Sequence, residues 1–359
     1  MIVLGERGEI NMSNKSINVL VTAVGNMGVG GQIVKALRYS SLHISIIGID
    51  ISSFNIPNDD LDIFYQISVS NDEEKVQVIN NIIKKHDIDI VFVGCENDYI
   101  FFQKNRAIFE NKSIYLAINS DEISRIGFDK YKTYSMLSRK GIVVPKFWKI
   151  NTVDDCKIID RFPVVIKPNR NSSASKNVFI AFSLQDTVCL VKYMLNLNID
   201  IIVQEYIGNE NAEYTIEVTS DVNANILGSI IIQRNFDASI TYRDKVYKAG
   251  RFYTIASGIT QGYTIHDEQI KQQAELIAKT LHSCGSLNIQ AMFVNGQLLI
   301  IEVHPMMTSS VYIRALAGYN EPENIIKKEI LKENVIYKYD NVQVIRKLVS
   351  EVVRKEEIK

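Results

Sequence analysis

Three side chains in the last third of the chain could hold a metal ion against phosphate groups. Two short apolar segments flank Asn295-Gly296, the strongest short-range signal for a tight β-hairpin turn. Gln290 lies on the first predicted strand, whereas Glu302 and His304 lie two residues apart on the second and therefore share one face. Oxygen donors on paired strands can bind a divalent cation that also binds phosphates. The same pattern also fits an ordinary hairpin with a few polar side chains.

A lysine at the end of an apolar strand could bind an anion. Lys167 follows the apolar residues 163–166, whose side chains we expect to be buried. Because an unpaired buried charge is costly, a lysine at this position needs an anionic partner. The phosphate groups of a nucleotide would supply one.

A glycine cluster near the N-terminus could also face phosphate groups. Gly25, Gly28 and Gly31 lie between a predicted strand and a predicted helix, where backbone amides can bind phosphate. With Asp50 at the end of the next strand, the pattern suggests a bound dinucleotide. The spacing is similar to that of extended short-chain dehydrogenases, but the Tyr-x-x-x-Lys pair of those enzymes is missing from this sequence. Close packing, or one wall of a substrate pocket, is the other interpretation.

The elements that position these residues follow from hydrophobic periodicity. Strands and helices alternate up to residue 118, which indicates a parallel sheet covered by helices, and an α+β pattern follows. Residues 234–262 are polar and predict no clear element, and the tail from residue 340 predicts one amphipathic helix. The predicted strands are 18–24, 44–50, 88–93, 114–118, 163–167, 177–181, 200–205 and two within 213–233. The predicted helices are 29–39, 72–86, 129–140, 184–195, 267–282, 309–318 and 322–333.

Size and composition exclude several classes of protein. The chain has 359 residues, so more than one domain is expected. Its 40 Lys and Arg nearly balance its 41 Asp and Glu, so no nucleic-acid partner is implied. No apolar run is long enough to span a bilayer, and the N-terminus lacks the pattern of a secretion signal. Four scattered cysteines without metal or redox spacing predict free thiols in the cytoplasm.

The hairpin resembles the metal-binding end of ATP-grasp enzymes, most closely the large subunit of carbamoyl-phosphate synthetase and related single-chain ligases. Those enzymes carry a Gly-Ser-x-Asn-[Val/Ile]-Gln strand, then an apolar strand that ends Glu-x-Asn-Pro-Arg. This chain has the first strand intact at residues 285–290 and ends the second as Glu302-Val303-His304-Pro305-Met306. Further motifs follow the same order, so the likeness runs from about residue 17 to about residue 330.

The resemblance implies an α/β fold, in which a Rossmann-like pre-ATP-grasp domain precedes two α+β ATP-grasp lobes. Residues 1–16 are expected to be a disordered leader, with Met12 as an alternative start. The expected parts are 1–16 leader, 17–120 Rossmann-like domain, 121–206 first lobe with a linker helix, 207–335 second lobe with the hairpin, and 336–359 helical tail.

The resemblance also implies a site for ATP and Mg²⁺ (or Mn²⁺) between the lobes. Lysines and a small-residue loop would contact the phosphates, the strand end at residues 205–207 would face the adenine edge, and an acidic residue would bind the ribose. The implied nucleotide-binding residues are Lys130, Lys167, Ser172, Ser173, Ser175, Glu205, Tyr206, Ile207 and Glu213. The implied metal ligands are Gln290, Glu302 and His304.

Two positions depart from the family pattern. His304 replaces an asparagine, and imidazole is a poor ligand for Mg²⁺. It could bind Mn²⁺, hydrogen-bond a phosphate, or leave the metal to its two neighbours. Met306 replaces an arginine that faces the substrate, so Arg251 or Arg314 is expected to supply that charge. The other basic residues between 234 and 251 are Arg234, Arg243, Lys245 and Lys248.

The implied activity is ADP-forming ligation of a carboxylate to an amine or ammonia through an acyl phosphate. Lys167, with Arg251 and Arg314, would take the catalytic roles, and the enzyme could be a homodimer, as many relatives are. The alternatives are a carbamoyl-phosphate-type or small-molecule kinase, a nucleotide-binding protein without activity, and a dinucleotide-dependent reductase. The sequence does not identify the carboxylate or the amine.

Overall fold

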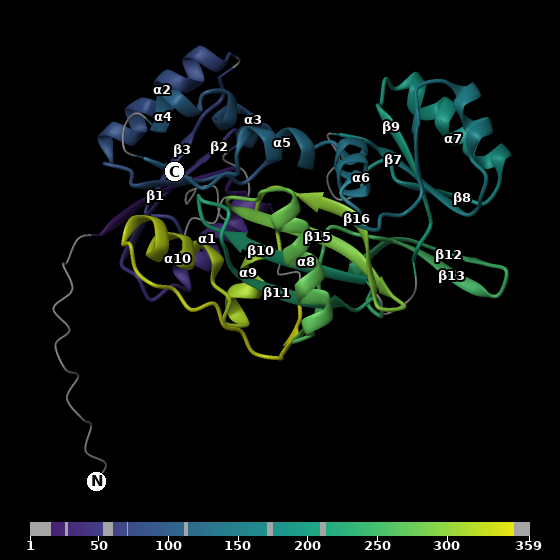
Figure 1. The fold of residues 1–359 in the computed structure, drawn as a ribbon. Helices are drawn as coiled ribbons and strands as arrows, with labels where there is room; N and C mark the ends of the chain where they lie inside the picture. Colours follow the sequence, from purple (N-terminus) through teal and green to yellow (C-terminus); the bar gives the residue numbers. More distant parts are fainter. Residues whose placement is uncertain are drawn as a thin grey trace, which may run out of the picture.

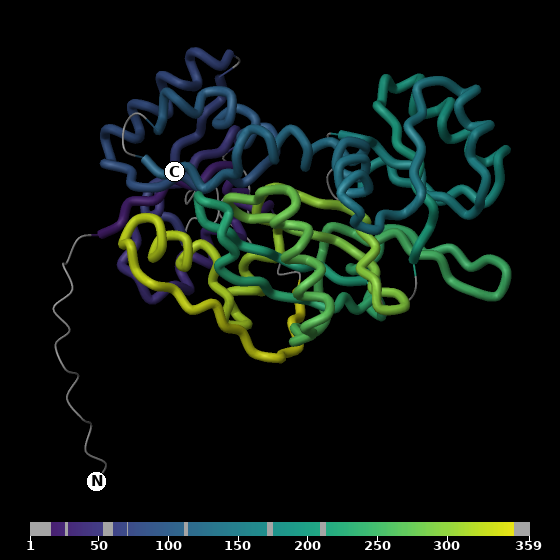
Figure 2. The backbone as a smooth tube through the Cα atoms, viewed as in Figure 1, coloured from purple at the N-terminus to yellow at the C-terminus, as the bar shows by residue number. Residues whose placement is uncertain are grey.

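Three β-sheets, one projecting hairpin and the helices that cover them make up the computed structural model (Figure 1). Its mixed α/β architecture agrees with the sequence prediction. The tube in Figure 2 shows that the chain passes through the three sheets in sequence order. The described residues are 16–25, 28–52, 60–69, 71–110, 114–170, 175–208 and 213–347. Residues 1–15 of the expected leader and the last twelve residues lie outside them.

The first part is a five-stranded parallel sheet with the order β3-β2-β1-β4-β5. Helices cover both of its faces, and therefore its central strands are apolar runs without alternation. Helix α1 and the C-terminal helix α9 pack on one face, and α2, α3 and α4 pack on the other. The elements are β1 (Ile17–Thr22), α1 (Val29–Arg38), β2 (Ile44–Asp50), β3 (Ile63–Gln66), α2 (Asp72–Lys85), β4 (Ile90–Phe92), α3 (Glu96–Lys104), α4 (Arg106–Glu110) and β5 (Tyr115–Leu116).

The second part is a four-stranded antiparallel sheet with the order β6-β9-β7-β8, reached through two helices. Helix α7 packs on one of its faces, and Val164, Ile166 and Val203 belong to the core between them. The elements are α5 (Asp121–Gly127), α6 (Lys130–Arg139), β6 (Phe147–Ile150), the 3₁₀ helix η2 (Val153–Ile158), β7 (Val164–Pro168), β8 (Phe179–Ala181), α7 (Leu184–Asn196) and β9 (Ile201–Glu205).

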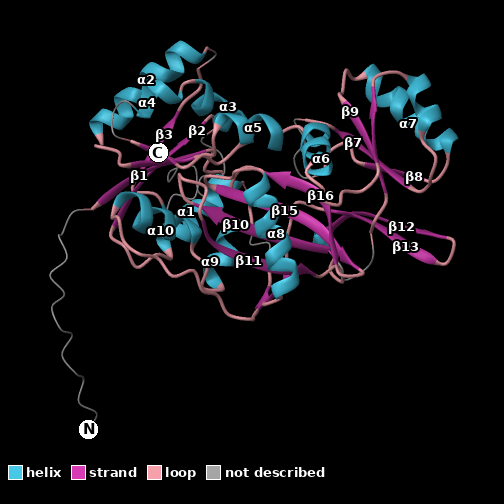
Figure 3. Ribbon diagram, in the orientation of Figure 1, coloured by secondary structure: helices cyan, strands magenta, loops and turns pink. Residues whose placement is uncertain are grey.

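The third part is a six-stranded sheet with the order β16-β15-β10-β11-β14-β17. Helix α8 packs on this sheet, and the two-stranded β12–β13 hairpin projects from it beneath the second part (Figure 3). The predicted turn at Asn295-Gly296 joins β15 to β16, and both residues have positive φ. The elements are β10 (Glu213–Ser220), β11 (Ile226–Arg234), η3 (Ser239–Thr241), β12 (Tyr242–Lys248), β13 (Arg251–Ala256), β14 (Gly262–Ile265), α8 (Glu268–Thr280), β15 (Ser286–Val294) and β16 (Gln297–His304).

The C-terminal segment differs from its prediction. Helices α9 (Val311–Leu316) and α10 (Glu321–Ile325), with the π-helix η4 (Ile326–Ile330), agree with the two predicted helices. The described residues from 332 to 347 contain no helix, and strand β17 (Gln343–Val344) pairs there with β14. The amphipathic pattern was misread because Val344 is buried as part of an extended chain that crosses the sheet edge. Among the described residues, no helix is long and apolar enough to cross a membrane.

Candidate active site

A cavity of about 980 Å³ lies where the three parts meet. The first part contributes Gly28, Val29 and residues 94–97, and the second contributes Lys130, Lys167 and residues 204–208. The six-stranded sheet and the segments after it complete the wall. Their lining residues include Glu213, Arg243, Gln290, Met292, Glu302, His304, Met306, Met307, Thr308, Ser309 and Arg346. The volume suits a ligand at the upper end of the size range of small-molecule sites.

Lys167 lies at this cavity, near the end of β7, and it is 5% exposed. Its Nζ donates to Tyr134 Oη at 3.0 Å, to Gln204 Oε1 at 2.6 Å and to the carbonyl oxygen of Ile301 at 2.8 Å. All three acceptors are neutral. Burial, reinforced by the charge of Lys130 and opposed by Glu302, lowers the pKa of Lys167 to about 7. A polyphosphate would supply the anionic charge that these partners do not.

Tyr134 and Gln204 were not identified from the sequence. Tyr134 is wholly buried on α6, and its hydroxyl, which has one proton to donate, lies within hydrogen-bond distance of the Ile301 carbonyl oxygen and 2.9 Å from Gln204 Oε1. Gln204 is a polar residue within the apolar strand β9, which is the signal that could have revealed it. The network joins the four-stranded sheet to β16, so it fixes the distance between the two walls of the cavity.

Lys130 and Glu302 form an ion pair across the cavity wall. Lys130 Nζ lies 2.8 Å from Glu302 Oε1, and both side chains are largely buried. Burial alone would raise the pKa of Glu302, but Lys130, His304 and Lys167 together lower it to about 2. Glu302 is therefore an anion at neutral pH. The N-cap Asp129, whose side chain accepts from the Lys132 amide, begins the helix that carries Lys130.

The predicted metal ligands lie together on the β15–β16 hairpin. Gln290 and Glu302 are directly paired in register and both line the cavity. His304 Nε2 lies 3.7 Å from Glu302 Oε1, and burial lowers the pKa of His304, so its imidazole is neutral at pH 7. In the described part of the chain, no group of three or more His, Cys, Asp and Glu side chains could hold a metal. The hairpin thus offers two oxygen donors that suit Mg²⁺ and one imidazole that does not.

Asn119 fixes the hairpin against the first part of the fold. Its Nδ2 donates to the carbonyl oxygen of Ser286 at 2.7 Å and to that of Pro305 at 3.0 Å. Its Oδ1 accepts from the Cys284 amide at 2.8 Å. These contacts hold the start of β15 and the end of β16 together, so the side chains of Gln290 and Glu302 have a fixed relative position.

The residues predicted for the nucleoside also line the cavity. Glu205, Tyr206 and Ile207 line it at the end of β9, with the Glu205 carboxylate turned to Arg161 at 2.7 Å. Glu213 also lines the cavity, and its Oε1 accepts from Arg234 Nη1 at 2.5 Å. Arg234 is therefore a structural partner of the predicted ribose ligand rather than a surface residue.

The predicted phosphate loop is described only in part. Ser172 and Ser173 lie outside the described residues. Ser175 lines the cavity and donates from its hydroxyl to the Ala256 carbonyl oxygen at 2.6 Å, which connects this loop to β13. Ser175 and Asn177 have φ angles of 56° and 57°, the left-handed region that glycine favours.

Two residues expected to carry catalytic charge do not line the cavity. Arg251 is exposed at the start of β13, with its guanidinium 4.4 Å from the centre of the Tyr253 ring. The neighbouring Gly250 forms the outer turn of the projecting hairpin, so Arg251 lies at the outer end of that hairpin. Arg243, from the same polar segment, is the residue that lines the cavity.

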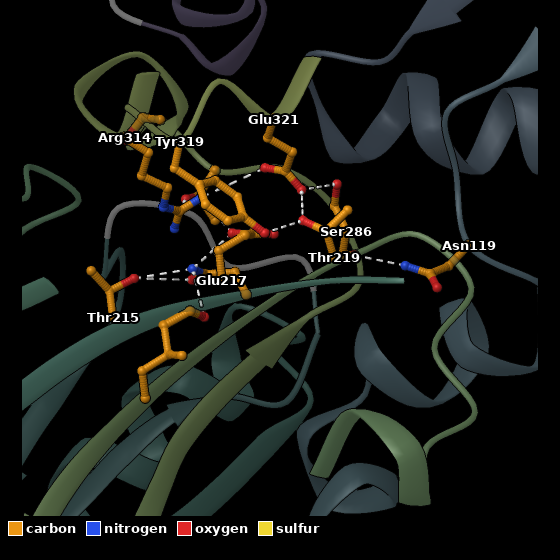
Figure 4. A network of polar contacts seen from close by, with 12 residues as sticks. Asn119, Thr215, Glu217, Thr219, Ser286, Arg314, Tyr319 and Glu321 are labelled. Atoms are coloured by element: carbon orange, nitrogen blue, oxygen red, sulfur yellow. Dashed lines mark hydrogen bonds and ion pairs between the residues drawn. The ribbon is translucent and has the colours of Figure 1, made fainter. Parts of the chain in front are cut away.

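Arg314 is fully buried and is also absent from the cavity wall. Its guanidinium donates to Glu217 and lies 4.0 Å from Glu321, within the polar network shown in Figure 4. Glu321 Oε1 accepts in turn from Ser286 at 2.6 Å and from Thr219 at 3.0 Å. The amphipathic pattern of α9 could not reveal that its arginine faces buried acids of the sheet. Arg314 therefore does not replace the arginine missing at Met306.

The glycine cluster allows close packing at the edge of the parallel sheet. A Cβ on Gly30 would lie 2.2 Å from the Thr22 carbonyl oxygen, and one on Gly94 would lie 2.1 Å from the same atom. Asp50 Oδ2 accepts from the Gly25 amide at 3.1 Å. The tight packing brings the start of α3 to the cavity, so Glu96 lines it. Sequence reasoning did not identify this residue. Burial raises the pKa of Glu96, Lys130 lowers it and Glu302 raises it further.

Comparisons with known proteins identify this architecture. Residues 127–252 match the family model of the RimK-like ATP-grasp domain. The L-amino acid ligase from Bacillus licheniformis superposes with a TM-score of 0.61 at 15% identity, covering 88% of this chain and 74% of that one. The chain has the ATP-grasp fold. The narrower likeness to carbamoyl-phosphate synthetase stays a prediction.

Other ATP-grasp structures agree. The D-alanine–D-alanine ligase from Bacillus anthracis superposes with a TM-score of 0.56 at 15% identity, covering 88% of this chain and 96% of that one. The biotin carboxylase domain of the Hydrogenobacter thermophilus 2-oxoglutarate carboxylase, a dimer in complex with MgADP, ADP and bicarbonate, has a TM-score of 0.61 at 16% identity, with coverages of 91% and 72%. The sequence matches no curated protein. The superpositions establish the ATP-grasp fold, but at identities this low they leave the substrates open.

Proposed function

We propose that this chain is an ATP-dependent ligase that joins a carboxylate to an amine or ammonia and releases ADP and phosphate. One observation carries the proposal: Lys167 and Glu302, from two different sheets, line the same cavity. Lys167 Nζ donates to the carbonyl of Ile301, the residue next to Glu302, so a cation and an anion face one space. The ATP-grasp fold of the chain and the ligases among its structural relatives support this activity.

The two ends of the cavity suit the two ends of ATP. We place the adenine edge against the backbone at residues 205–207 and the ribose hydroxyls at Glu213, because a carboxylate accepts from both hydroxyls of a diol. Lys130, Lys167 and Ser175 would contact the phosphates. With this charge present, the amine of Lys167 would be protonated, since a polyphosphate favours the charged form.

The metal donors fit this arrangement in part. Gln290 and the ionised Glu302 would hold Mg²⁺ (or Mn²⁺), which when bound would offset negative charge on the phosphates. The neutral imidazole of His304 suits Mn²⁺ better than Mg²⁺. The catalytic work of the chain's own residues is to fix the orientation of the phosphates, to offset their charge and to exclude water.

The proposed reaction balances without a protein nucleophile. A carboxylate oxygen of the substrate attacks the γ-phosphorus, and the bond from that phosphorus to the bridging oxygen breaks as ADP leaves. The amine nitrogen then attacks the carbonyl carbon of the acyl phosphate, the C–O bond to phosphate breaks, and the nitrogen loses a proton. Phosphoryl transfer as the end point, as in a small-molecule kinase, is the second candidate function, because the same cavity would serve it.

A screen of ADP release tests the proposal. Carboxylates are crossed with amines and ammonia, and each pair is compared with either reactant alone. A ligase requires both reactants, a kinase requires one acceptor, and a protein that only binds nucleotides releases no ADP with any pair. Glu302→Gln should reduce ADP release by at least about 100-fold, whereas the surface change Glu268→Gln should not. Undiminished release in Glu302→Gln would refute the metal assignment.

The remaining parts fit supporting roles. We infer that the parallel sheet is a Rossmann-like domain whose edge, at Gly28 and residues 94–97, forms the acceptor wall of the cavity. The oligomeric state stays open, with a homodimer as one candidate, and the cytoplasm is the expected compartment, which the four unpaired cysteines favour.

A further inference from the structure

The C-terminal segment brings an arginine to the cavity that the sequence did not identify. Arg346 lines the cavity together with Met306, Thr308 and Ser309. Its Nη2 donates to the carbonyl oxygen of Ser309, and its buried Nε has no hydrogen-bond partner within the described part of the chain. Among the described residues, no carboxylate forms an ion pair with it, and the charged group that acts on its pKa is another arginine, Arg314.

The chain before Arg346 is firmly attached to the six-stranded sheet. Tyr339 stacks on His266, with ring centres 4.2 Å apart, and donates from its hydroxyl to the Ile265 carbonyl oxygen at 2.7 Å. The Val342 amide donates to Thr264 Oγ1 at 2.8 Å. Two residues after Val342, the buried Val344 pairs with β14. The arginine therefore reaches the cavity from a fixed strand.

Arg346 could supply the positive charge that is missing at Met306. Between Glu302 and Arg314 no arginine lines the cavity, because Met306 lies there and Arg314 is paired with buried acids, so the arginines that line it are Arg243 and Arg346. We propose that Arg346 binds the acceptor carboxylate, and the acyl phosphate formed from it, at the end of the cavity beside Met306. This inference rests on the proposed ligase function.

The chemistry of the guanidinium supports an anionic ligand at this point. Two of its nitrogens can donate in parallel to a carboxylate or a phosphate, which fixes orientation as well as charge. Burial and the neighbouring charge of Arg314 lower the pKa of Arg346 to about 10. A bound anion would offset that penalty. The hydroxyl of Thr308, also on the cavity wall, is a further donor for the same ligand.

Anion binding to the full chain tests this inference before the substrate is known. Acetate and inorganic phosphate are titrated separately at constant ionic strength, with chloride as the reference, and the rise in melting temperature gives an apparent affinity. We expect the wild type to bind at least one of the two anions. In Arg346→Gln the affinity should fall by about 10-fold or more, because a charge-assisted hydrogen bond is lost from a buried site.

Two variants serve as controls. Lys347→Gln removes the same charge from the adjacent, exposed residue and should bind the anions like the wild type. Arg346→Lys retains the charge without the paired donors and should lie between the wild type and Arg346→Gln; it also serves if the glutamine variant folds poorly. Equal affinity in the wild type and both Arg346 variants, or no anion binding by the wild type, would overturn the inference.

A separate titration with MgADP distinguishes failure of the Arg346 inference from failure of the proposed ligase function. If MgADP binds equally to the wild type and Arg346→Gln while anion affinity differs, both the inference and the nucleotide site are supported. Normal MgADP binding without an Arg346-dependent anion site refutes the inference alone. If MgADP does not bind to the wild type, the proposed function fails, whatever the anions do.

Discussion

At the scale of single residues, the environment of Lys167 is unusual, because lysine side chains are mostly exposed and this one is buried. Its amine has only neutral hydrogen-bond acceptors, and burial together with the charge of Lys130 lowers its pKa to about 7, although the carboxylate of Glu302 opposes this shift. A ligand that brings negative charge should therefore change its protonation. This makes Lys167 a reporter of nucleotide binding.

Proton uptake on ATP binding is the corresponding prediction. With a pKa of about 7 in the empty protein, Lys167 is mostly neutral at alkaline pH, and polyphosphate would raise its pKa. Binding should take up roughly one proton at about pH 8.5 and almost none at about pH 5.5, where Lys167 is already charged. Calorimetry in buffers of different ionisation enthalpy measures this number.

Lys167→Met should abolish this proton uptake and weaken ATP binding, whereas Lys192→Met, an exposed change in the same lobe, should do neither. Uptake that is independent of pH, or unchanged in Lys167→Met, would show that Lys167 does not contact the phosphates.

The network around Arg314 gives a second prediction at this scale. One guanidinium lies between two fully buried glutamates, and burial raises the pKa of Glu217 well above its ordinary value while Arg314 lowers it. Arg314→Met would leave both acids without a cation, so the free energy of unfolding should fall by about 3–5 kcal/mol. Urea denaturation measures this loss, with the exposed Arg139→Met as the control.

If Arg314→Met had normal stability but released no ADP, the structural role would be contradicted. Arg314 would then have the catalytic role that the sequence predicted. The sequence could not decide this point. Lys167 and Glu302 follow strand patterns whose faces can be inferred, but the partner of an arginine on a short helix depends on the packing of distant elements.

At the scale of elements, the regular strands and helices were predictable where periodicity was strong. The predicted hairpin, the helix at 184–195 and the strand at 44–50 agree with the structure to within one or two residues. The short elements β3, α4 and β6 were missed because they are too brief to show a period. The described part of the tail was assigned the wrong period, since Gln343 and Val344 pair with β14 as an extended strand. The rest of the predicted helix, residues 348–359, lies outside the described residues.

The glycine contacts at the edge of the parallel sheet predict which substitution this turn tolerates. A Cβ on Gly94 would lie 2.1 Å from the Thr22 carbonyl oxygen and 2.6 Å from the Gly30 Cα, which are backbone atoms that cannot move alone. Gly94→Ala should therefore lower the free energy of unfolding by about 1–3 kcal/mol. A urea titration of the purified variant checks this.

Gly25→Ala is the matched control, because its nearest contact would be Asp50 Oδ2 at an ordinary 3.7 Å. Equal stability of the two variants would mean that the tight packing between the two glycine turns does not hold in solution.

At the scale of the whole molecule, the site is a product of three sheets that meet at one cavity. Sequence motifs predicted Lys130, Lys167, Gln290 and Glu302, because each lies within or next to a strand or helix with a clear pattern, and all four line the cavity. Gln204 has only the weak signal of a polar residue within an apolar strand. Arg346 has no such signal, because its place at the cavity depends on where the C-terminal segment lies in space. The substrate of the reaction depends on that same placement.

A crystal structure of the full chain with Mn²⁺ and a non-hydrolysable ATP analogue would test the central claim most directly. We predict the phosphates between Lys167 and Glu302, an anomalous Mn²⁺ peak at Gln290 and Glu302, and the adenine at residues 205–207. A nucleotide bound outside this cavity, or a metal peak away from Glu302, would contradict the account.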